Sequence, residues 1–305
     1  MKVWLLIGAL IALTYAGDAS IYGDQSAWGG ECGTSERQSP IDINHIHRTI
    51  YYGSKVGSFG GNVEITRITD KKMQFDITDS ENTIIKMPEN WPVGHTNGLQ
   101  AKQIHFHWGP IDGDGGSEHT LFGKRYAGEA HLVTRNLDQE DDSAGDAYAV
   151  FGIFLEHGDP EDDAVTANLQ DLVSGAATEL SLDILYSPER TKSIFTYDGG
   201  LTTPDCQGIV FWQVLEHTVK VPKELINDMR GATKIVQNYR DLQELNGRHI
   251  THRLLDQHYT SPEGGSETCH LDCRSAQETC MWKMSGSTAT IPSLFLLFIG
   301  LIFLM

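Results

Sequence analysis

The sequence predicts a mostly-β domain with a few short peripheral helices, an α+β chain. Three observations support this fold class. Short segments that alternate polar and apolar residues, or that are rich in β-branched and aromatic residues, recur along the chain. Glycine-rich turns, such as the one at residues 113–116, separate these segments. Helical periodicity is limited to three stretches, so helices are expected only beside the β-structure.

The individual elements follow from these patterns. Strands are expected at residues 63–68, 73–77, 83–87, 103–108, 130–134, 148–156, 209–214 and 217–219. Helices are expected at residues 164–176, 188–190 and 223–229, and Pro222 is placed to open the last of them. No repeat, low-complexity segment or linker interrupts the middle of the chain, which predicts one domain over residues 20–262.

Net charge limits the partners of this domain. The 305-residue chain carries a formal net charge of −18. Binding to nucleic-acid phosphates requires lysine and arginine, so no nucleic-acid partner is expected. The acidic runs at residues 138–142 and 159–163 are interpreted as solvated loops rather than as calcium-binding or mineral-binding surfaces.

The amino-terminal residues have the pattern of a secretory signal peptide. Lys2 precedes an apolar run at residues 3–13, and small residues follow at Ala16, Gly17 and Ala19. An apolar run of this length is too short for a membrane span. We therefore expect residues 1–16 to be removed in the secretory pathway, with cleavage after residue 19 as the alternative.

The carboxy-terminal residues predict a glycosylphosphatidylinositol (GPI) anchor. Residues 291–305 are apolar except for Ser293, and a small polar stretch precedes them. This order is typical of a tail that is replaced by a GPI anchor, here near Ser285, with residues 287–305 as the propeptide. The alternative is a short single-pass helix, but about 20 apolar residues normally span a bilayer and no basic residue follows this tail. The expected location is the extracellular face of the plasma membrane.

Five cysteines in a secreted chain predict disulfides with one cysteine left over. Cys32 and Cys206 lie far apart in the folded region, and a bond between them would close a long loop. Cys269, Cys273 and Cys280 crowd into a polar stem at residues 263–286, where two of them could pair locally. A zinc site in the stem is an alternative, but three unevenly spaced cysteines are a weak pattern for one.

Three histidines on two expected strands form the candidate metal site. Polar and apolar residues alternate along residues 103–109, so His105 and His107 share one face of their strand. The alternation at residues 129–133 gives His131 an equivalent place. Burying three imidazoles without partners would be costly, and zinc removes that cost. Three neutral imidazoles leave a tetrahedral zinc ion one open position for water, which is the arrangement of a catalytic site.

Two further polar residues lie on the same strand faces as these histidines. Gln103 stands beside His105, and Glu129 stands beside His131. Groups of this kind accept the second ring N–H of a metal-bound histidine and so orient the ring. Gln103 and Glu129 are therefore predicted to support the zinc ligands.

The remaining histidines are interpreted as structural. His45 and His47 form a second His-X-His, but it has no matching third histidine, and its neighbours suit a loop. We interpret it as a surface or locally hydrogen-bonded pair. The same interpretation applies to His95, His119, His217, His249, His252 and His258.

Five segments together resemble the α-class carbonic anhydrases. They read QSPID at residues 38–42, QIHFHWG at 103–109, SEHT at 117–120, EAHLV at 129–133 and LTTP at 201–204. They occur in the family's order, and the similarity runs from about Tyr22 to Leu255. The resemblance implies a single domain around a large, twisted, mainly antiparallel sheet, with Zn²⁺ as cofactor and with CO2 and bicarbonate as substrates.

The cysteines and the tail extend this resemblance. Cys32 and Cys206 resemble the disulfide pair of the family's secreted and membrane-linked members. The apolar tail resembles that of the GPI-anchored branch. The implied protein is thus an extracellular, membrane-anchored zinc lyase.

The resemblance also implies catalytic roles. His105, His107 and His131 are the implied ligands of zinc, which in carbonic anhydrases lowers the pKa of its bound water to about 7. The Thr202 hydroxyl is implied to accept a hydrogen bond from the attacking hydroxide and to donate one to Glu118, since a hydroxyl can do both.

The implied substrate site combines polar contacts with an apolar wall. Thr202 and Thr203 are implied to contact bicarbonate. CO2 has no charge and little polarity, so it needs apolar surroundings, and the family's hydrophobic wall corresponds to Val133, Val150, Leu201, Val210 and Trp212. Each of these residues alone would be ordinary core, and only their convergence on the zinc would make a pocket.

The chain departs from the fastest members of the family at one position. Those members carry a histidine that moves the proton to buffer, and the alignment places Lys71 there. An ordinary lysine, with a pKa of about 10.4, stays protonated at neutral pH, whereas histidine titrates in this range. An active enzyme limited by proton transfer is therefore expected, with His95 as an alternative shuttle.

A different class of function is the alternative. The fold could serve binding or adhesion in a catalytically weak ectodomain. Loss of a zinc histidine would mark that case, and His105, His107 and His131 are all present.

Overall fold

The computed structural model describes residues 22–44, 46–52, 55–68, 73–111, 113, 115–160, 163–256, 269–272 and 281–284. The predicted signal peptide, Lys71, His45, His258, Cys273, Cys280 and the predicted anchor site at Ser285 lie outside the described residues. No helix within the described ranges is long and apolar enough to cross a membrane.

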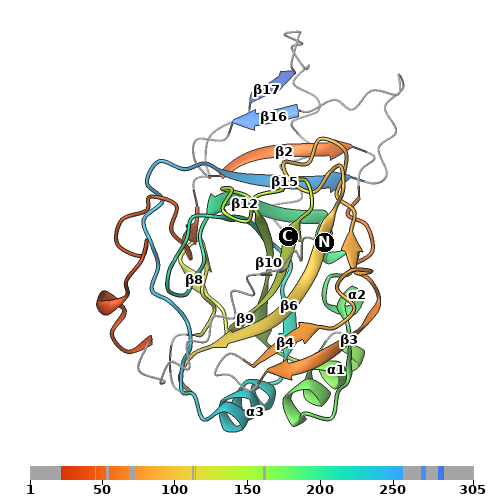
Figure 1. Ribbon diagram of the computed structural model, residues 1–305, viewed down its shortest axis with the longest axis vertical. Coiled ribbons are helices and arrows are strands. Elements are labelled where there is room, and N and C mark those ends of the chain that lie inside the picture. The colour runs from red at the N-terminus through yellow and green to blue at the C-terminus, as the bar shows by residue number, and fades with distance from the viewer. Residues whose placement is uncertain are drawn as a thin grey trace, which may run out of the picture.

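One 14-stranded sheet dominates the fold (Figure 1). Its strands are β2 (Ile46–Tyr52), β3 (Asn62–Ile68), β4 (Gln74–Ile77), β5 (Ile84–Ile85), β6 (Leu99–Trp108), β9 (Gly128–Asn136), β10 (Tyr148–His157), β11 (Glu179–Ser181), β12 (Ser193–Gly199), β13 (Val210–Leu215), β14 (Val219–Val221), β15 (Ile250–Asp256), β16 (Cys269–Asp272) and β17 (Met281–Met284). The main path runs β11-β3-β4-β6-β9-β10-β13-β12-β15-β2-β16-β17, while β14 pairs with β10 and β5 with β6.

Most neighbours in this sheet are antiparallel. Among the described residues of this sheet, parallel pairing is limited to β10 with β13 and β14 and to β2 with β15. A small second sheet is formed by β1 (Asp42–Ile43), β7 (Thr120–Leu121) and β8 (Lys124–Arg125). The predicted fold class, a mostly-β domain around a large and mainly antiparallel sheet, is confirmed.

Helices cover one face of the large sheet. They are α1 (Asp163–Ser174), α2 (Leu182–Leu185) and α3 (Lys223–Thr233), and 3-10 turns occur at Gln25–Ala27 and Arg190–Lys192. The apolar residues Leu169 of α1, Leu182 of α2 and Ile226 of α3 belong to the same buried cluster as Ile104 and Phe106 of β6. Figure 1 shows these helices gathered beside β3 and β4. The face of β6 opposite Ile104 is therefore left for the histidines.

The sequence prediction of individual elements is right for the long, regular segments. The expected strand at 217–219 is two residues too early, because the ladder with β10 begins only where Val219 pairs with Leu155. The expected helix at 188–190 is also wrong. The α-helix in this region is α2, and the chain then makes a 3-10 turn whose Thr191 N–H donates to the carbonyl of Ser187.

The sequence patterns did not predict three long strands: β2 near the start of the chain, and β12 and β15 beyond its middle. β12 and β15 pair with each other, and β2 pairs in parallel with β15. The loop expected around the second His-X-His is thus a strand from Ile46 onward. His47 is nevertheless exposed, as expected, and its ring lies edge-on to that of His249 with centroids 5.2 Å apart.

Two strands from the expected stem also join the sheet. β16 pairs antiparallel with β2, and β17 pairs with β16. Figure 1 shows this hairpin at the end of the molecule opposite α3. The edge of the sheet that β2 would otherwise form is thereby covered, which removes an unpaired row of backbone groups.

A disulfide joins Cys32 to Cys206, as the family resemblance implied. The two cysteines are separated by 174 residues, so the bond closes a long loop, and loop-closure entropy gives it about 5 kcal/mol of stabilisation at most. Two hydrogen bonds reinforce the junction: Glu31 N–H donates to the carbonyl of Asp205, and Gln38 Nε2 to that of Cys206. The amino-terminal segment is thus fastened to the loop that follows Thr202 and Thr203.

Candidate metal centre

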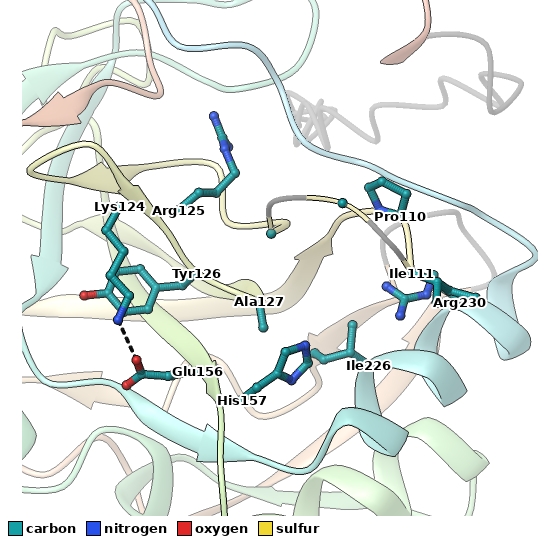
Figure 2. Close-up of a pocket in the computed structure, with 12 residues that line it drawn as sticks. Pro110, Ile111, Lys124, Arg125, Tyr126, Ala127, Glu156, His157, Ile226 and Arg230 are labelled. Atoms are coloured by element: carbon teal, nitrogen blue, oxygen red, sulfur yellow. Dashed lines mark hydrogen bonds and ion pairs between the residues drawn. The ribbon is translucent and has the colours of Figure 1, made fainter.

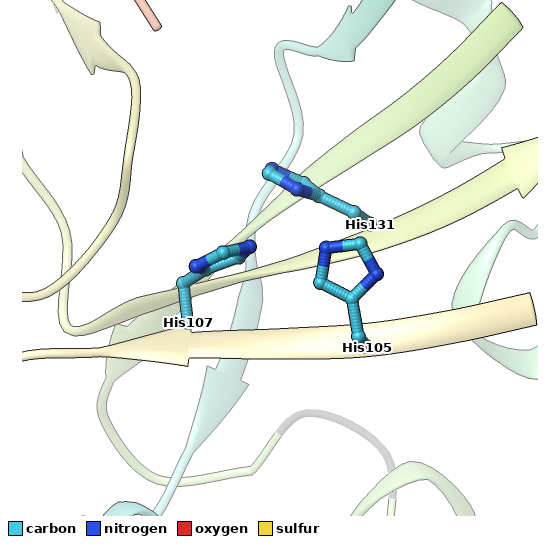
Figure 3. A group of neighbouring side chains, drawn as sticks. All are labelled: His105, His107 and His131. Carbon is cyan, nitrogen blue, oxygen red and sulfur yellow. The ribbon is translucent and has the colours of Figure 1, made fainter. Parts of the chain in front are cut away.

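The register of β6 against β9 brings the three histidines together. The strands are antiparallel, and His105 lies directly opposite His131. Residues that face each other across such a pair point to the same side of the sheet, and His107 shares that side because it is two residues from His105. The ring centroids are 4.9 Å apart for His105–His107, 5.2 Å for His105–His131 and 4.6 Å for His107–His131 (Figure 3).

A bulge sets this register. Ala101 pairs with Thr134, but Gln103 pairs with Val133, so Lys102 is an extra residue on β6. A bulge shifts the faces of all residues beyond it, because side chains alternate with a period of two. Residues 103–108 therefore keep their histidines on the face away from the helices, while Ile104 and Phe106 enter the helix-covered core.

Two of the imidazoles have one nitrogen held by an uncharged acceptor. His105 Nδ1 lies 2.9 Å from Gln103 Oε1, as predicted. His107 Nδ1 lies 2.6 Å from the backbone carbonyl oxygen of Asn238. Since these oxygens only accept, both Nδ1 atoms carry the proton, and the lone pair of each ring is on Nε2.

In the third imidazole, that of His131, the acceptor meets Nε2 instead of Nδ1. His131 Nε2 lies 2.9 Å from Glu129 Oε1, so the lone pair of this ring is on Nδ1. Glu129 also accepts from His119, whose Nδ1 lies 2.8 Å from the same oxygen and whose backbone N–H lies 2.8 Å from Oε2. Burial raises the pKa of Glu129, but the adjacent imidazoles outweigh it and hold that pKa well below its usual range. Glu129 is thus an ionised, fully satisfied acceptor.

A buried hydrogen-bond chain extends from Glu129. Burial raises the pKa of Tyr197, so its hydroxyl stays protonated. His119 donates to Glu129 and must accept at Nε2, which lies 2.6 Å from the Tyr197 hydroxyl. That hydroxyl in turn lies 2.8 Å from Ser39 Oγ. The chain runs Ser39 to Tyr197 to His119 to Glu129, and it fixes the orientation of His131.

The donor set fits a zinc ion. One nitrogen from each of His105, His107 and His131 lies within 4.8 Å of the other two, and all three side chains are buried. Three neutral imidazole nitrogens with oriented rings are the ligand set of catalytic zinc. A second grouping of His119, Glu129 and His131 is also compact, but its contacts are the hydrogen bonds just described, so it supports the centre rather than forming another one.

Glu118 lies beside this donor set and is fully buried. Its Oε1 accepts from the backbone N–H of Arg240 at 2.9 Å and lies 3.4 Å from His107 Nδ1. Its Oε2 lies 3.9 Å from His131 Nδ1. The Glu118 carboxylate is thus fixed by the hydrogen bond at Oε1, and its Oε2 lies near the ring of His131.

The residues predicted to form an apolar wall pack together in one cluster. Val150, Val210 and Trp212 are buried in one apolar cluster, and Val133 and Leu201 pack against it. The Trp212 ring lies 4.8 Å, centroid to centroid, from that of His131. Thr202 and Thr203 keep only 6% and 7% of their surface exposed, and His105 keeps 6%.

Two residues that support the metal centre, Asn238 and Tyr197, could not be identified from the sequence pattern. Asn238 acts on the metal site through a backbone oxygen, and its side-chain amide also accepts from Trp108 N and donates to Phe106 O. A carbonyl can come from any residue, so no residue type marks it. Tyr197 resembles an ordinary aromatic core residue until β12 is recognised as a strand.

Comparison with known proteins agrees with the fold and the centre. The family model of eukaryotic-type carbonic anhydrase matches residues 23–254. Carbonic anhydrase 6 of Bos taurus is 31% identical over 252 residues, which covers 76% of this chain and 75% of that protein. Carbonic anhydrase 4 of Mus musculus is 28% identical over 248 residues, covering 73% and 77%.

The chain belongs to the eukaryotic-type carbonic anhydrase family. With its buried histidine cluster matching the family's zinc site, it is a zinc enzyme of the carbonate dehydratase class.

Replacing Gln103 tests the orientation of His105. Gln103→Ala removes the acceptor of the His105 ring N–H, and we expect zinc affinity about 10–100-fold weaker because such partners hold ligands in place. Affinity is measured by competition with a chromophoric chelator. The matched control is Gln100→Ala, on the same strand, which should bind zinc like the wild type. Equal affinities of the Gln103→Ala variant and the wild type would contradict this role.

Proposed function

We propose that this protein catalyses the reversible hydration of CO2 to bicarbonate and a proton at the extracellular face of a membrane. The main observation behind this proposal is the set of three convergent imidazoles next to the buried Glu118. In each ring, one nitrogen faces the other two rings and the second nitrogen meets a hydrogen-bond acceptor. Membership of the carbonic anhydrase family supports the reaction. Its small-molecule partners are CO2 and bicarbonate.

His105, His107 and His131 would hold zinc, which when bound would make a nucleophile available near neutral pH by lowering the pKa of its water to about 7, the value known for carbonic anhydrases. The chain's own residues then orient the attack. Thr202 would accept a hydrogen bond from the nucleophile and donate one to Glu118, so that a lone pair of the nucleophile would point toward CO2. The Arg240 N–H that donates to Glu118 Oε1 supports this role, because it fixes the position of the carboxylate.

The apolar wall receives CO2. Val133, Val150, Leu201, Val210 and Trp212 offer it a surface without competing hydrogen bonds, and their packing into one cluster supports this assignment. Thr203, beside Thr202, contacts bicarbonate. The apolar residues also exclude water that would compete for the same position.

The Thr202 hydroxyl provides the sharpest test of the orientation. Thr202→Val should lower the hydration rate constant about 100-fold with zinc content unchanged, because the nucleophile loses its acceptor. Thr202→Ser keeps the hydroxyl and is the matched control, with a rate within about tenfold of the wild type. Stopped-flow CO2 hydration and metal analysis give both quantities. A zinc-loaded Thr202→Val protein as fast as the wild type would falsify the assignment.

Proton export is proposed to limit turnover. Lys71 occupies the sequence position where fast relatives carry histidine, and a protonated lysine does not accept the proton. Turnover should therefore rise with buffer concentration, and Lys71→His should raise it most at low buffer. The neighbouring Lys72→His is the control and should have little effect. A turnover that is insensitive to buffer in the wild type would refute this limit.

A secreted and anchored protein is the proposed setting. We assign residues 1–16 as signal peptide, 20–262 as catalytic domain, 263–286 as stem and 287–305 as the propeptide replaced by a GPI anchor near Ser285. The Cys32–Cys206 disulfide supports passage through an oxidising compartment.

Phospholipase treatment of intact cells tests the anchor. A phosphatidylinositol-specific phospholipase C should release CO2-hydration activity into the medium, because it cleaves the lipid from the glycan. A mock treatment without enzyme is the control. Activity that stays with the membrane after cleavage of a known GPI-anchored marker would instead indicate the short spanning helix.

A further inference from the structure

A cavity of about 290 Å³ lies outside the metal centre, between the start of β9, the end of β10, α3 and the segment after β6 (Figure 2). Its walls combine apolar and cationic side chains. Pro110, Ala127 and Ile226 contribute apolar surface, while Arg230 and His157 contribute nitrogen-bearing groups. This volume is near the lower limit of small-molecule sites, so it suits a small ligand.

Arg230 brings a charge that no carboxylate neutralises among the described residues. Its Nη1 donates to the carbonyl of Gly109 and its Nη2 to Asn227 Oδ1, both uncharged oxygens. Its Nε is buried and has no hydrogen-bond acceptor in the described part of the chain. Burial lowers the pKa of Arg230, which shows that its charge is poorly solvated.

Glu156, the acidic residue that lines the cavity, already interacts with Lys124 and Thr218. Glu156 Oε1 lies 2.6 Å from Lys124 Nζ, and its Oε2 accepts from Thr218 at 3.1 Å. Figure 2 shows the Lys124–Glu156 pair on the far side of the cavity from Arg230. The pair is neutral overall and does not offset the charge of Arg230.

The pKa of His157 indicates that this wall of the cavity has a positive electrostatic environment. Burial first, and then the charges of Lys223 and Arg230, lower the pKa of His157, while Glu224 opposes them. In Figure 2 the His157 ring and the Arg230 guanidinium lie on the side of the cavity lined by Ile226. An anion between them would neutralise Arg230 and could accept a hydrogen bond from the imidazole.

We propose that this cavity binds a small organic carboxylate, with its charged group against Arg230 and His157 and its apolar part against Ile226, Ala127 and Pro110. The planar guanidinium matches a carboxylate better than a spherical ion. The apolar walls favour an organic anion over a simple inorganic one. The site is separate from the metal centre and does not require the proposed activity.

Binding of benzoate tests this site. Calorimetry is performed on the zinc-loaded protein saturated with a sulfonamide, so that the carboxylate cannot bind at the metal. We expect one benzoate per chain in this state. Benzamide, which has the same shape without the charge, should bind about tenfold more weakly or not at all. No binding of benzoate at millimolar concentration, or equal affinity for benzamide, would overturn the proposal.

Two variants locate the binding. Arg230→Met removes the charge and Ala127→Leu fills the cavity without touching Arg230, and each should weaken benzoate binding about tenfold or more. The control is Arg67→Met, which removes an arginine of β3 that also donates to a backbone carbonyl and does not line the cavity. Thermal melting confirms that each variant is folded. Benzoate affinity that is the same in the wild type and in both cavity variants would place the ligand elsewhere and overturn the assignment.

Discussion

The structure depends on how three buried imidazoles are oriented. A buried imidazole needs a partner for each ring nitrogen, and here one nitrogen of each ring meets an oxygen acceptor: Gln103, the Asn238 carbonyl and Glu129. These acceptors decide which nitrogen carries the proton. The lone pairs that remain converge, and a divalent ion is the partner that satisfies all three at once. The rest of the domain can be understood as support for this arrangement.

That support comes from both faces of the sheet. The bulge at Lys102 places the histidines on one face of β6 and sends Ile104 and Phe106 into the core under the helices. On the histidine face, Trp212 packs against His131, and Tyr197 completes the hydrogen bonds of His119. The helix-covered face is apolar, while the other face carries the polar groups together with a second apolar cluster. The disulfide between Cys32 and Cys206 holds the amino-terminal segment to the loop after Thr203.

The sequence was sufficient where function depends on side chains in a regular pattern. Period-two alternation placed His105, His107 and His131 on one face, with Gln103 and Glu129 beside them, and the structure bears this geometry out. It was insufficient where function depends on the backbone or on distant segments. The Asn238 carbonyl has no residue-type signature, and it lies 131 residues from His107. The strands β12, β15 and β2 are consecutive in the sheet although β2 comes near the start of the chain, so their order was not visible in local patterns.

Metal content together with CO2 hydration in two histidine variants tests the central claim most directly. His105→Ala removes a ligand of the convergent set, whereas His47→Ala removes an exposed histidine of the second His-X-His. The account predicts that the wild type and His47→Ala bind one zinc ion per chain and show sulfonamide-sensitive hydration. It predicts that His105→Ala loses both. A His105→Ala protein that retained its zinc and its full hydration rate would contradict the account.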